Sequence, residues 1–102
     1  MIKIKIDYEV NSFDYIFYNR RNINSIYIKK FYRNNITDMS FMFYGCSSLK
    51  ELDLNNFKTD NVTNMYCMFY RCSLLKELNL NNFNTDNVTK MSFMFSYCSS
   101  LK

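Results

Sequence analysis

Cysteine has the broadest chemical capability in this sequence, because a thiolate can bind a metal, form a disulfide or act as a nucleophile. Three of the four cysteines, Cys46, Cys72 and Cys98, recur at one constant interval along the chain. If segments of that length stack, these thiols lie about 5 Å apart, near enough for a disulfide. Histidine and Cys-x-x-Cys pairs are both missing, so the pattern does not favour a metal site. We predict a buried, reduced thiol column, with a disulfide or a metal as the alternative.

The acidic residues offer a weaker case for catalysis. Glu51 and Glu77 are separated by the same interval, and two adjacent carboxylates could shift each other's pKa. Lys50 and Lys76 flank them, however, which favours a solvated row of charges. Without histidine the chain has no ordinary general base near neutral pH, and it shows neither a glycine-rich phosphate loop nor a nucleophile motif. We therefore predict a protein that is not an enzyme, with no catalytic residue, metal or cofactor.

Aromatic residues make up 19% of the chain, and several of them share the same interval. Cys67 takes the position that Phe41 and Phe93 hold one interval away, which favours a packing role for this fourth thiol. A column of tyrosines could contact a partner, but such rings more often pack on one another and leave only their hydroxyls in water. We predict the packed arrangement for this column, which consists of Tyr18, Tyr44 and Tyr70.

An ungapped 26-residue repeat explains these spacings. The tripeptide MFY at residues 42–44 recurs at residues 68–70, and the register of apolar residues continues in both directions. The sequence therefore predicts a single body of stacked units. Its parts are an N-terminal capping strand with a partial coil at 1–15, full repeats at 16–41, 42–67 and 68–93, and a partial repeat at 94–102.

Each unit carries two hydrophobic patterns. Residues 49–54 end in the period-two alternation of a strand with one buried face, and Phe57 anchors the turn after it. Asp60 can cap a helix, and an apolar stripe at helical spacing then runs to about residue 72; Gly45 supplies the matching stop in the preceding unit. The stripe consists of Val62, Met65, Phe69 and Cys72.

A unit of strand, turn and helix predicts an α/β solenoid. We expect a leucine-rich-repeat-like, right-handed coil of strand-turn-helix units, with a parallel strand ladder on one side and short helices on the other. Residues 2–8 are typical of an extra strand over the first coil, whereas the last strand edge has no cover. These ends indicate a fragment of a longer array, a decayed gene product or end-to-end self-association.

The repeat resembles a known family. The segments LKELDLNNF (49–57), TDNVTNM (59–65) and MFYRCS (68–73) are similar to the bacterial surface protein 26-residue repeat, a BspA-type branch of the leucine-rich repeats. The likeness covers about residues 16–102. It implies a leucine-rich-repeat-like solenoid in an adhesin-type surface protein that binds host or cell-surface proteins. The first unit departs from the pattern, with Arg20 in place of cysteine, Arg33 in place of threonine and Asn34 in place of aspartate.

The outward positions of the predicted strands vary between repeats, whereas the buried columns barely change. That contrast is typical of a fixed scaffold with a variable surface, and repeat proteins commonly bind partners along such a face. We therefore predict a non-catalytic protein–protein interaction module with a protein partner. Its candidate binding face consists of Ser25, Tyr27, Lys29, Glu51, Asp53, Asn55, Glu77, Asn79 and Asn81.

Charge and hydropathy leave two alternatives open. The net charge is +4, and residues 1–33 hold the whole excess, with seven basic and three acidic side chains. This basic third could bind an anionic ligand or, less expected without a recognisable fold for it, nucleic acid.

The other alternative is a structural spacer without independent activity. No apolar run is long enough for a membrane span and no signal peptide is visible, so a surface location is implied by the family resemblance alone.

Overall fold

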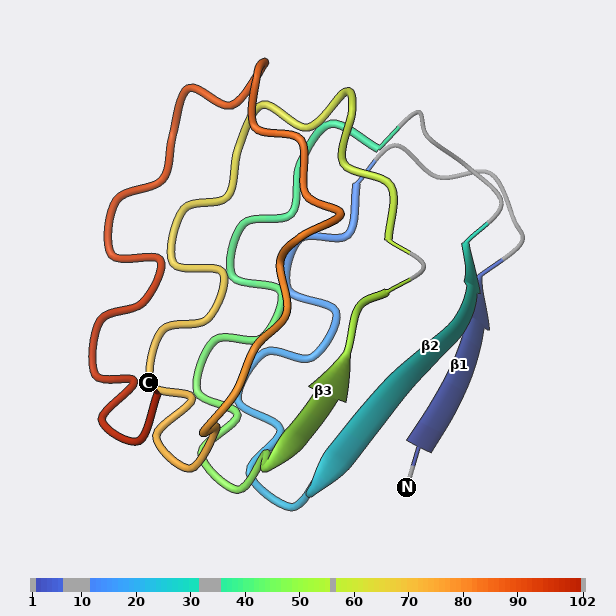
Figure 1. Cartoon of the computed structure of the whole chain (residues 1–102). Coiled ribbons are helices and arrows are strands. Elements are labelled where there is room, and N and C mark those ends of the chain that lie inside the picture. Colours follow the sequence, from blue (N-terminus) through green and yellow to red (C-terminus); the bar gives the residue numbers. More distant parts are fainter. Residues whose placement is uncertain (1, 7–11, 32–35, 56, 102) are drawn as a thin grey trace.

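The computed structural model describes residues 2–6, 12–31, 36–55 and 57–101. Three strands form one parallel sheet in the order β1-β2-β3 (Figure 1); they are β1 (Ile2–Ile6), β2 (Ser25–Phe31) and β3 (Glu51–Asp53). Partners on β2 and β3 are one repeat apart, as in the pair Ile26 and Leu52. Parallel neighbours need a long crossover connection, and the remainder of each repeat supplies it.

The other side of the molecule consists of four turn-rich segments that lie side by side (Figure 1). We call them the zigzag segments; they are residues 12–19, 38–45, 64–71 and 90–97. Isolated parallel bridges join each zigzag segment to the next, through Ser12, Asp38, Asn64 and Lys90. Equivalent residues of successive repeats are therefore neighbours on this side too.

Backbone hydrogen bonds in a zigzag segment alternate between two kinds of partner. The N–H groups of Phe41 and Phe43 donate to the carbonyls of Tyr66 and Met68 in the next repeat, each over 2.9 Å. The N–H group of the intervening Tyr44 instead donates to the carbonyl of Phe41, three residues back. Segment 38–45 is thus half turn and half ladder, and its backbone donors from Met39 to Gly45 are satisfied without a helix.

The prediction of a helix after Asp60 is wrong, because the described residues contain no helix. The apolar stripe was identified correctly, since Met65 and Phe69 are fully buried. An α-helix with its side chains is about 10 Å wide, whereas the stacked rings of Phe43 and Phe69 lie only 5.5 Å apart. Helices do not fit at that spacing, so a zigzag segment replaces each of them.

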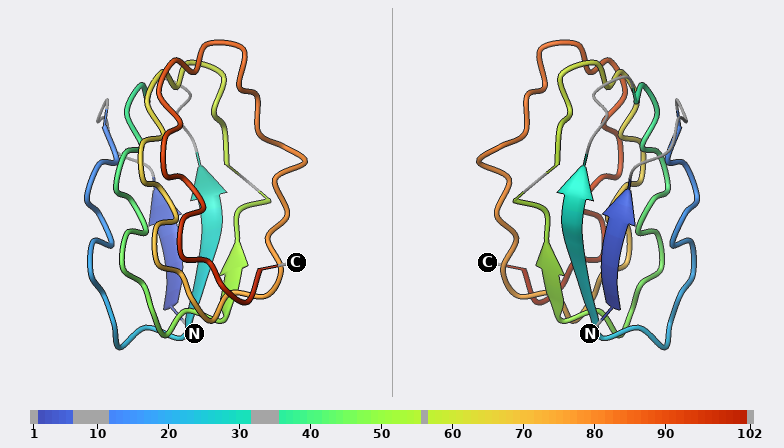
Figure 2. Two further views of the ribbon diagram at one scale, coloured as in Figure 1. Left: turned by 90° about the vertical axis from the view of Figure 1, so that its left-hand side faces the viewer. Right: turned by 90° about the vertical axis from the view of Figure 1, so that its right-hand side faces the viewer.

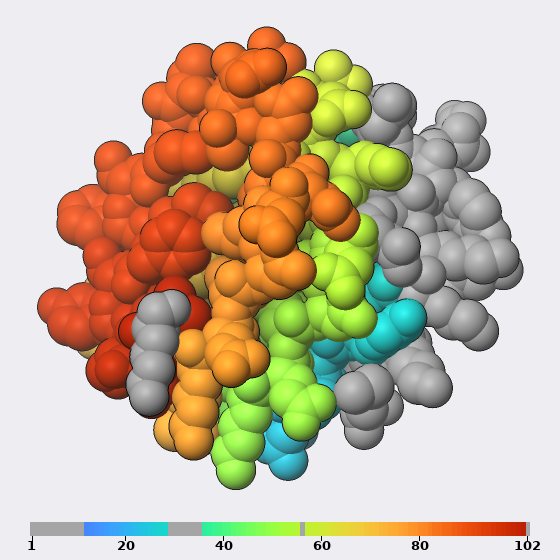
Figure 3. All heavy atoms as spheres, in the orientation of Figure 1, coloured from blue at the N-terminus to red at the C-terminus, as the bar shows by residue number. Residues whose placement is uncertain are grey.

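The predicted fold class is therefore wrong as well. Strand-turn-helix units, short helices on one side and a leucine-rich-repeat-like α/β solenoid are not what this chain forms. It is a small compact body of 30 × 28 × 22 Å with a short parallel sheet and zigzag segments (Figure 2). Figure 3 shows its repeats as bands of colour beside one another.

The sheet is shorter than the predicted ladder. β1 covers Ile2–Ile6 of the predicted N-terminal strand, and residues 7 and 8 lie outside the described residues. The predicted strand at 49–54 is reduced to Glu51–Asp53, and its equivalent around Leu78 forms no strand in the described part of the chain. Asn56, in the predicted turn before Phe57, and the first-unit substitutions Arg33 and Asn34 lie outside the description.

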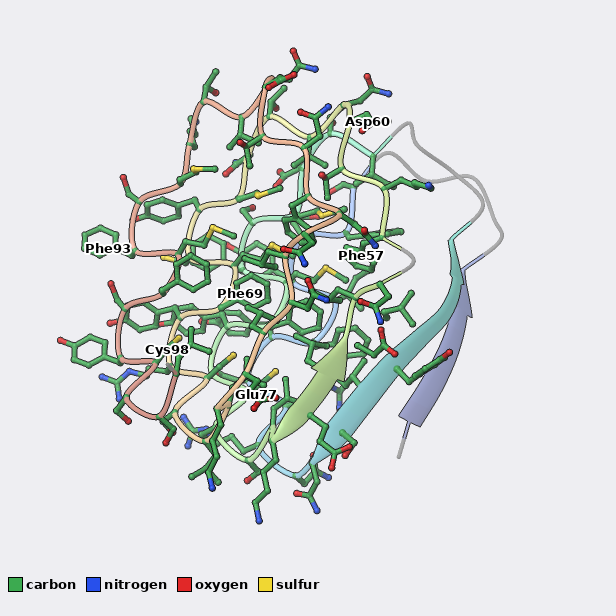
Figure 4. All side chains as sticks on the ribbon, viewed as in Figure 1. Phe57, Asp60, Phe69, Glu77, Phe93 and Cys98 are labelled. Atoms are coloured by element: carbon green, nitrogen blue, oxygen red, sulfur yellow. The ribbon has the colours of Figure 1, made fainter. Side chains whose placement is uncertain are left out.

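The core is a set of columns in which like residues stack across repeats. The rings of Phe17, Phe43, Phe69 and Phe95 follow one another at centroid separations of 5.5, 5.5 and 5.6 Å. Figure 4 shows Phe69 among these rings in the interior, whereas Phe93 projects at the outer edge. Buried methionines, leucines and isoleucines belong to the same hydrophobic core.

Each zigzag segment contains two residues in the left-handed region, four positions apart. Such a conformation costs roughly 1 kcal/mol for a residue other than glycine, so packing must maintain it. Only Gly45 is a glycine, and a Cβ there would clash with the Asn19 side chain. The two columns are Tyr15, Phe41, Cys67 and Phe93, and Asn19, Gly45, Arg71 and Tyr97.

Thr59 provides a polar link between two repeats inside the molecule. Its hydroxyl donates to the Asn84 carbonyl over 3.1 Å and accepts the Asn84 N–H over 2.8 Å, and the side chain is almost fully buried. Thr59→Val keeps the shape but leaves both Asn84 groups unpaired, so we expect a loss of about 2 kcal/mol in the free energy of unfolding. Chemical denaturation will measure it. Thr85→Val, at the exposed equivalent position, is the control, and equal losses in both variants would contradict this role.

Candidate binding surfaces

The sheet side carries the residues of the predicted binding face. The backbone register places Ser25 beside Glu51 and Tyr27 beside Asp53, so the sheet brings these four together as the repeat required. The Lys29 side chain lies outside the described part of the structure. Exposed members of the face are Glu51, Asn55, Glu77, Asn79 and Asn81, and half-buried ones are Ser25, Tyr27 and Asp53.

Two residues of this face, Asp53 and Asn79, shape the backbone of the turns that follow them. Asp53 Oδ1 accepts the N–H of Asn55, and Asn79 Oδ1 accepts the N–H of Asn81, each over 2.9 Å. These are Asx turns, which asparagine and aspartate favour. Asp53 and Asn79 therefore have structural partners, whereas Glu51 and Glu77 are exposed charges in the described part of the face (Figure 4 labels Glu77).

A second surface, formed by the zigzag segments, is rich in aromatic rings. We call it the aromatic ridge; it consists of Tyr15, Tyr18, Phe41, Tyr44, Tyr66, Tyr70, Phe93 and Tyr97. Its central rings stack nearly parallel, with Tyr44 lying 4.9 Å from Tyr18 and 4.7 Å from Tyr70. The predicted packing of this tyrosine column is confirmed.

The rings at both ends of the ridge are open to solvent. Tyr15 is 50% exposed at one end, and Phe93 and Tyr97 are 57% and 64% exposed at the other. Between them lies a hollow of about 260 Å³. Its lining consists of Phe41, Tyr44, Tyr66, Cys67, Tyr70 and Phe93.

The hollow arises where the repeat pattern changes. Cys67 replaces the ring that Phe41 and Phe93 supply one repeat away, and its thiol is buried as a packing role requires. Tyr66 stands edge-on between those two phenylalanines, with its centroid 5.4 Å from Phe41 and 5.9 Å from Phe93. In this repeat the aromatic ring therefore comes from Tyr66, one residue earlier than in the neighbouring repeats, and an indentation remains above the Cys67 thiol. The sequence shows this exchange, since serine precedes Phe41 and Phe93.

One cation lies on the ridge. The Arg71 guanidinium carbon is 4.9 Å from the Tyr97 ring centroid and 5.7 Å from that of Tyr70, which are cation–π distances. Desolvation beside its neighbours raises the pKa of the Tyr44 phenol, and Tyr18 and Tyr70 raise it further. The surface therefore combines tyrosines with one arginine, and these residue types carry most of the binding energy at protein interfaces.

The thiol column lies in the interior. The thiols of Cys46 and Cys72 donate to the carbonyls of Phe17 and Phe43 over 3.2 Å, and that of Cys98 donates to Phe69 over 3.0 Å. All four cysteines are free, as expected for a reduced column. Burial raises the pKa of Cys46 to about 11 and that of Cys72 further, so neither is a nucleophilic thiolate at neutral pH.

The described residues show neither a candidate metal site nor a candidate membrane span. No group of histidine, cysteine, aspartate or glutamate in the described ranges could hold a metal ion. Over those same ranges, no helix has the length and hydrophobicity that would let it cross a bilayer. The basic N-terminal third is only partly visible: Arg20 and Arg21 are exposed, while Arg33 and the side chains of Lys29 and Lys30 lie outside the described part.

Comparison with known proteins places most of the chain in one family. A family profile described as "Mycoplasma protein of unknown function, DUF285" matches residues 8–102. No curated protein and no solved structure matches the sequence. The match confirms a repeat-type family, and the BspA-type branch stays a prediction.

Proposed function

The chain belongs to the DUF285 family, and we propose that it serves as a non-catalytic protein–protein interaction module. The observation that carries the proposal is the aromatic ridge. Exposed large apolar groups on a small protein mark interaction sites, and here Tyr15, Phe93 and Tyr97 are each at least half exposed. The ridge also has a hollow for a partner side chain and an arginine beside it.

We place the primary contact at the hollow of the ridge. Tyrosine presents a rigid, amphipathic ring at low entropic cost, so a row of stacked tyrosines is organised before binding. The 26-residue motifs further support a BspA-type branch and an adhesin-type surface protein with a host or cell-surface partner. The predicted sheet-side face is the second candidate surface, because Glu51, Glu77 and Asn81 stand exposed along it.

The test compares two double variants that leave the core intact. Tyr66→Ser/Tyr70→Ser removes two walls of the hollow, and serine already occupies the equivalent positions at Ser92 and Ser96. Immobilised protein is probed by biolayer interferometry against a panel of purified extracellular host proteins. We expect at least one of them to bind, with a loss of roughly tenfold or more in affinity in this variant, as for tyrosines at an interface centre.

Glu51→Gln/Glu77→Gln is the matched control on the sheet side. We expect its affinity to stay near that of the wild type, and thermal melts will establish that both double variants fold. A loss in the control with none in the ridge variant would move the binding surface to the sheet. Binding of the wild type to no panel member would favour the structural spacer.

Anionic-ligand binding through the basic third has its own signature. Heparin is a suitable probe, and binding to it would fall steeply with salt. Arg20→Gln/Arg21→Gln would then weaken the interaction, whereas the ridge variant would not. This pattern, in the absence of a protein partner, would replace the interaction module with the anionic-ligand alternative.

A further inference from the structure

The two ends of the stack of repeats differ in how well the core is covered. In the zigzag segment 64–71 Met65 and Phe69 are fully buried, but their equivalents one repeat later, Met91 and Phe95, are each 42% exposed. Leu80, Phe83 and Val88 are likewise only partly buried. The C-terminal end of the stack is therefore an apolar cross-section through the core, which we call the tail face.

The tail face also presents a row of backbone donors. One repeat earlier, the N–H groups of Met65, Cys67, Phe69 and Arg71 donate to the next zigzag segment over 2.8 to 3.1 Å. The equivalent N–H groups have no hydrogen-bond acceptor in the described structure. They belong to Met91, Phe93, Phe95 and Tyr97.

The opposite end of the stack, which we call the head face, presents the matching acceptors. Carbonyls of the second zigzag segment, on Asp38, Ser40, Met42 and Tyr44, accept N–H groups from the first. The equivalent carbonyls of the first segment accept no hydrogen bond from any residue that the structure describes. They belong to Ser12, Asp14, Ile16 and Tyr18.

We propose that the tail face of one copy docks on the head face of another, continuing the zigzag ladder between molecules. Four donors at one end meet four acceptors at the other with the spacing and direction already used between repeats. In that register Ile16 of the second copy covers Met94 and Tyr15 stacks on Phe93, extending columns that exist within the chain. Unpaired ladder edges are templates for such pairing.

This contact is heterologous, because two different faces meet. A heterologous contact leaves each dimer with one head face and one tail face, so addition of copies does not end at two. Figure 1 shows the faces at opposite sides of the molecule, with β1 at the head face and the zigzag segment 90–97 at the tail face, so one copy can use both. The partner is therefore a second copy of this chain, added head to tail.

Two single variants, each blocking one face, provide the test. Ile16 is 40% exposed on the head face, so Ile16→Lys blocks that face, and Phe95→Lys blocks the tail face. By sedimentation velocity on the 102-residue chain, we expect the wild-type mass to rise with concentration beyond twice 12.4 kDa. Each variant alone is expected to remain at 12.4 kDa. A 1:1 mixture is expected to reach twice that mass and stop, because one intact head face meets one intact tail face.

Leu74→Lys is the matched control, because Leu74 is also 42% exposed but lies one repeat inward of the tail face. It is expected to assemble like the wild type. Dimer formation in the mixture itself shows that both blocked variants are folded. A wild type that stays monomeric would overturn the proposal. So would continued assembly of either blocked variant alone, or a mixture that gains no mass, since either outcome means that unlike faces do not meet.

Discussion

Phe69→Ala is expected to remove a large part of the stability of this protein. Phe69 is fully buried and stacks on Phe43 and Phe95, so truncation deletes ring contacts on both sides and leaves a cavity. Buried Phe→Ala substitutions cost roughly 3–5 kcal/mol, a large part of the 5–15 kcal/mol that typically separates folded from unfolded states. The free energy of unfolding from urea titration will measure this loss.

Phe95→Ala is the control, because it removes the same atoms from the same column. Phe95 is 42% exposed at the tail face and stacks on a single ring. At a protein concentration where the chain is monomeric, we expect its cost to be roughly a third of that for Phe69→Ala. Equal costs for the two variants would mean that Phe69 does not stack between Phe43 and Phe95 as it does in the structure.

Alkaline pH is expected to destabilise the protein through its thiol column. Burial raises the pKa of Cys46 from 9.0 to about 11. Between these values the unfolded chain loses this proton while the folded chain keeps it. The protonated Cys46 thiol therefore makes its full contribution to the free energy of unfolding below pH 9. This contribution declines as pH rises, by about 2 kcal/mol at pH 11.

Cys72 adds to the same effect. Its pKa is raised by burial and further by the thiols of Cys46 and Cys98 on either side. Urea titrations at pH 7, 9, 10 and 11 on the wild type and on Cys46→Ala/Cys72→Ala separate this contribution from that of surface tyrosines and lysines. We expect a shallower decline in the double variant, and parallel declines would contradict a buried thiol column.

Much of the internal arrangement could be predicted from the repeat alone. Alignment at the repeat interval pairs Cys46 with Cys72, Tyr44 with Tyr70 and Ile26 with Leu52. The structure places the two members of each pair side by side. A repeat fixes which residues share a column because each unit must bury its apolar face against the next. It does not fix the path of the backbone between columns.

The helix was predicted because two different backbone conformations can produce the same spacing of buried residues. Those residues are Val62, Met65, Phe69 and Cys72. A helix buries one residue in three or four through its 3.6-residue turn. The zigzag segment buries the same residues with turns punctuated by left-handed residues such as Cys67 and Arg71. Periodicity alone cannot distinguish them, but the predicted separation of about 5 Å between the thiols already conflicted with helices about 10 Å wide.

The candidate surfaces were accessible to sequence reasoning to different degrees. The sheet-side columns follow from alternation, whereas the Asx turns that occupy Asp53 and Asn79 depend on local backbone geometry. The ridge was visible in the sequence through the regular column Tyr18, Tyr44 and Tyr70 and through the position that Phe41, Cys67 and Phe93 share. Tyr66 and Tyr97 escaped notice because they break the repeat, and an aromatic residue at an irregular position was the available signal.

The fold depends on zigzag segments that exchange backbone hydrogen bonds across repeats. The most direct test is a through-hydrogen-bond scalar coupling in an NMR spectrum of the isotope-labelled chain. We expect the amide nitrogen of Phe43 to couple to the carbonyl carbon of Met68, across the 2.9 Å bond to the next repeat. Coupling instead to the carbonyl of Met39, four residues back as in an α-helix, would contradict the zigzag segments and the surfaces built on them.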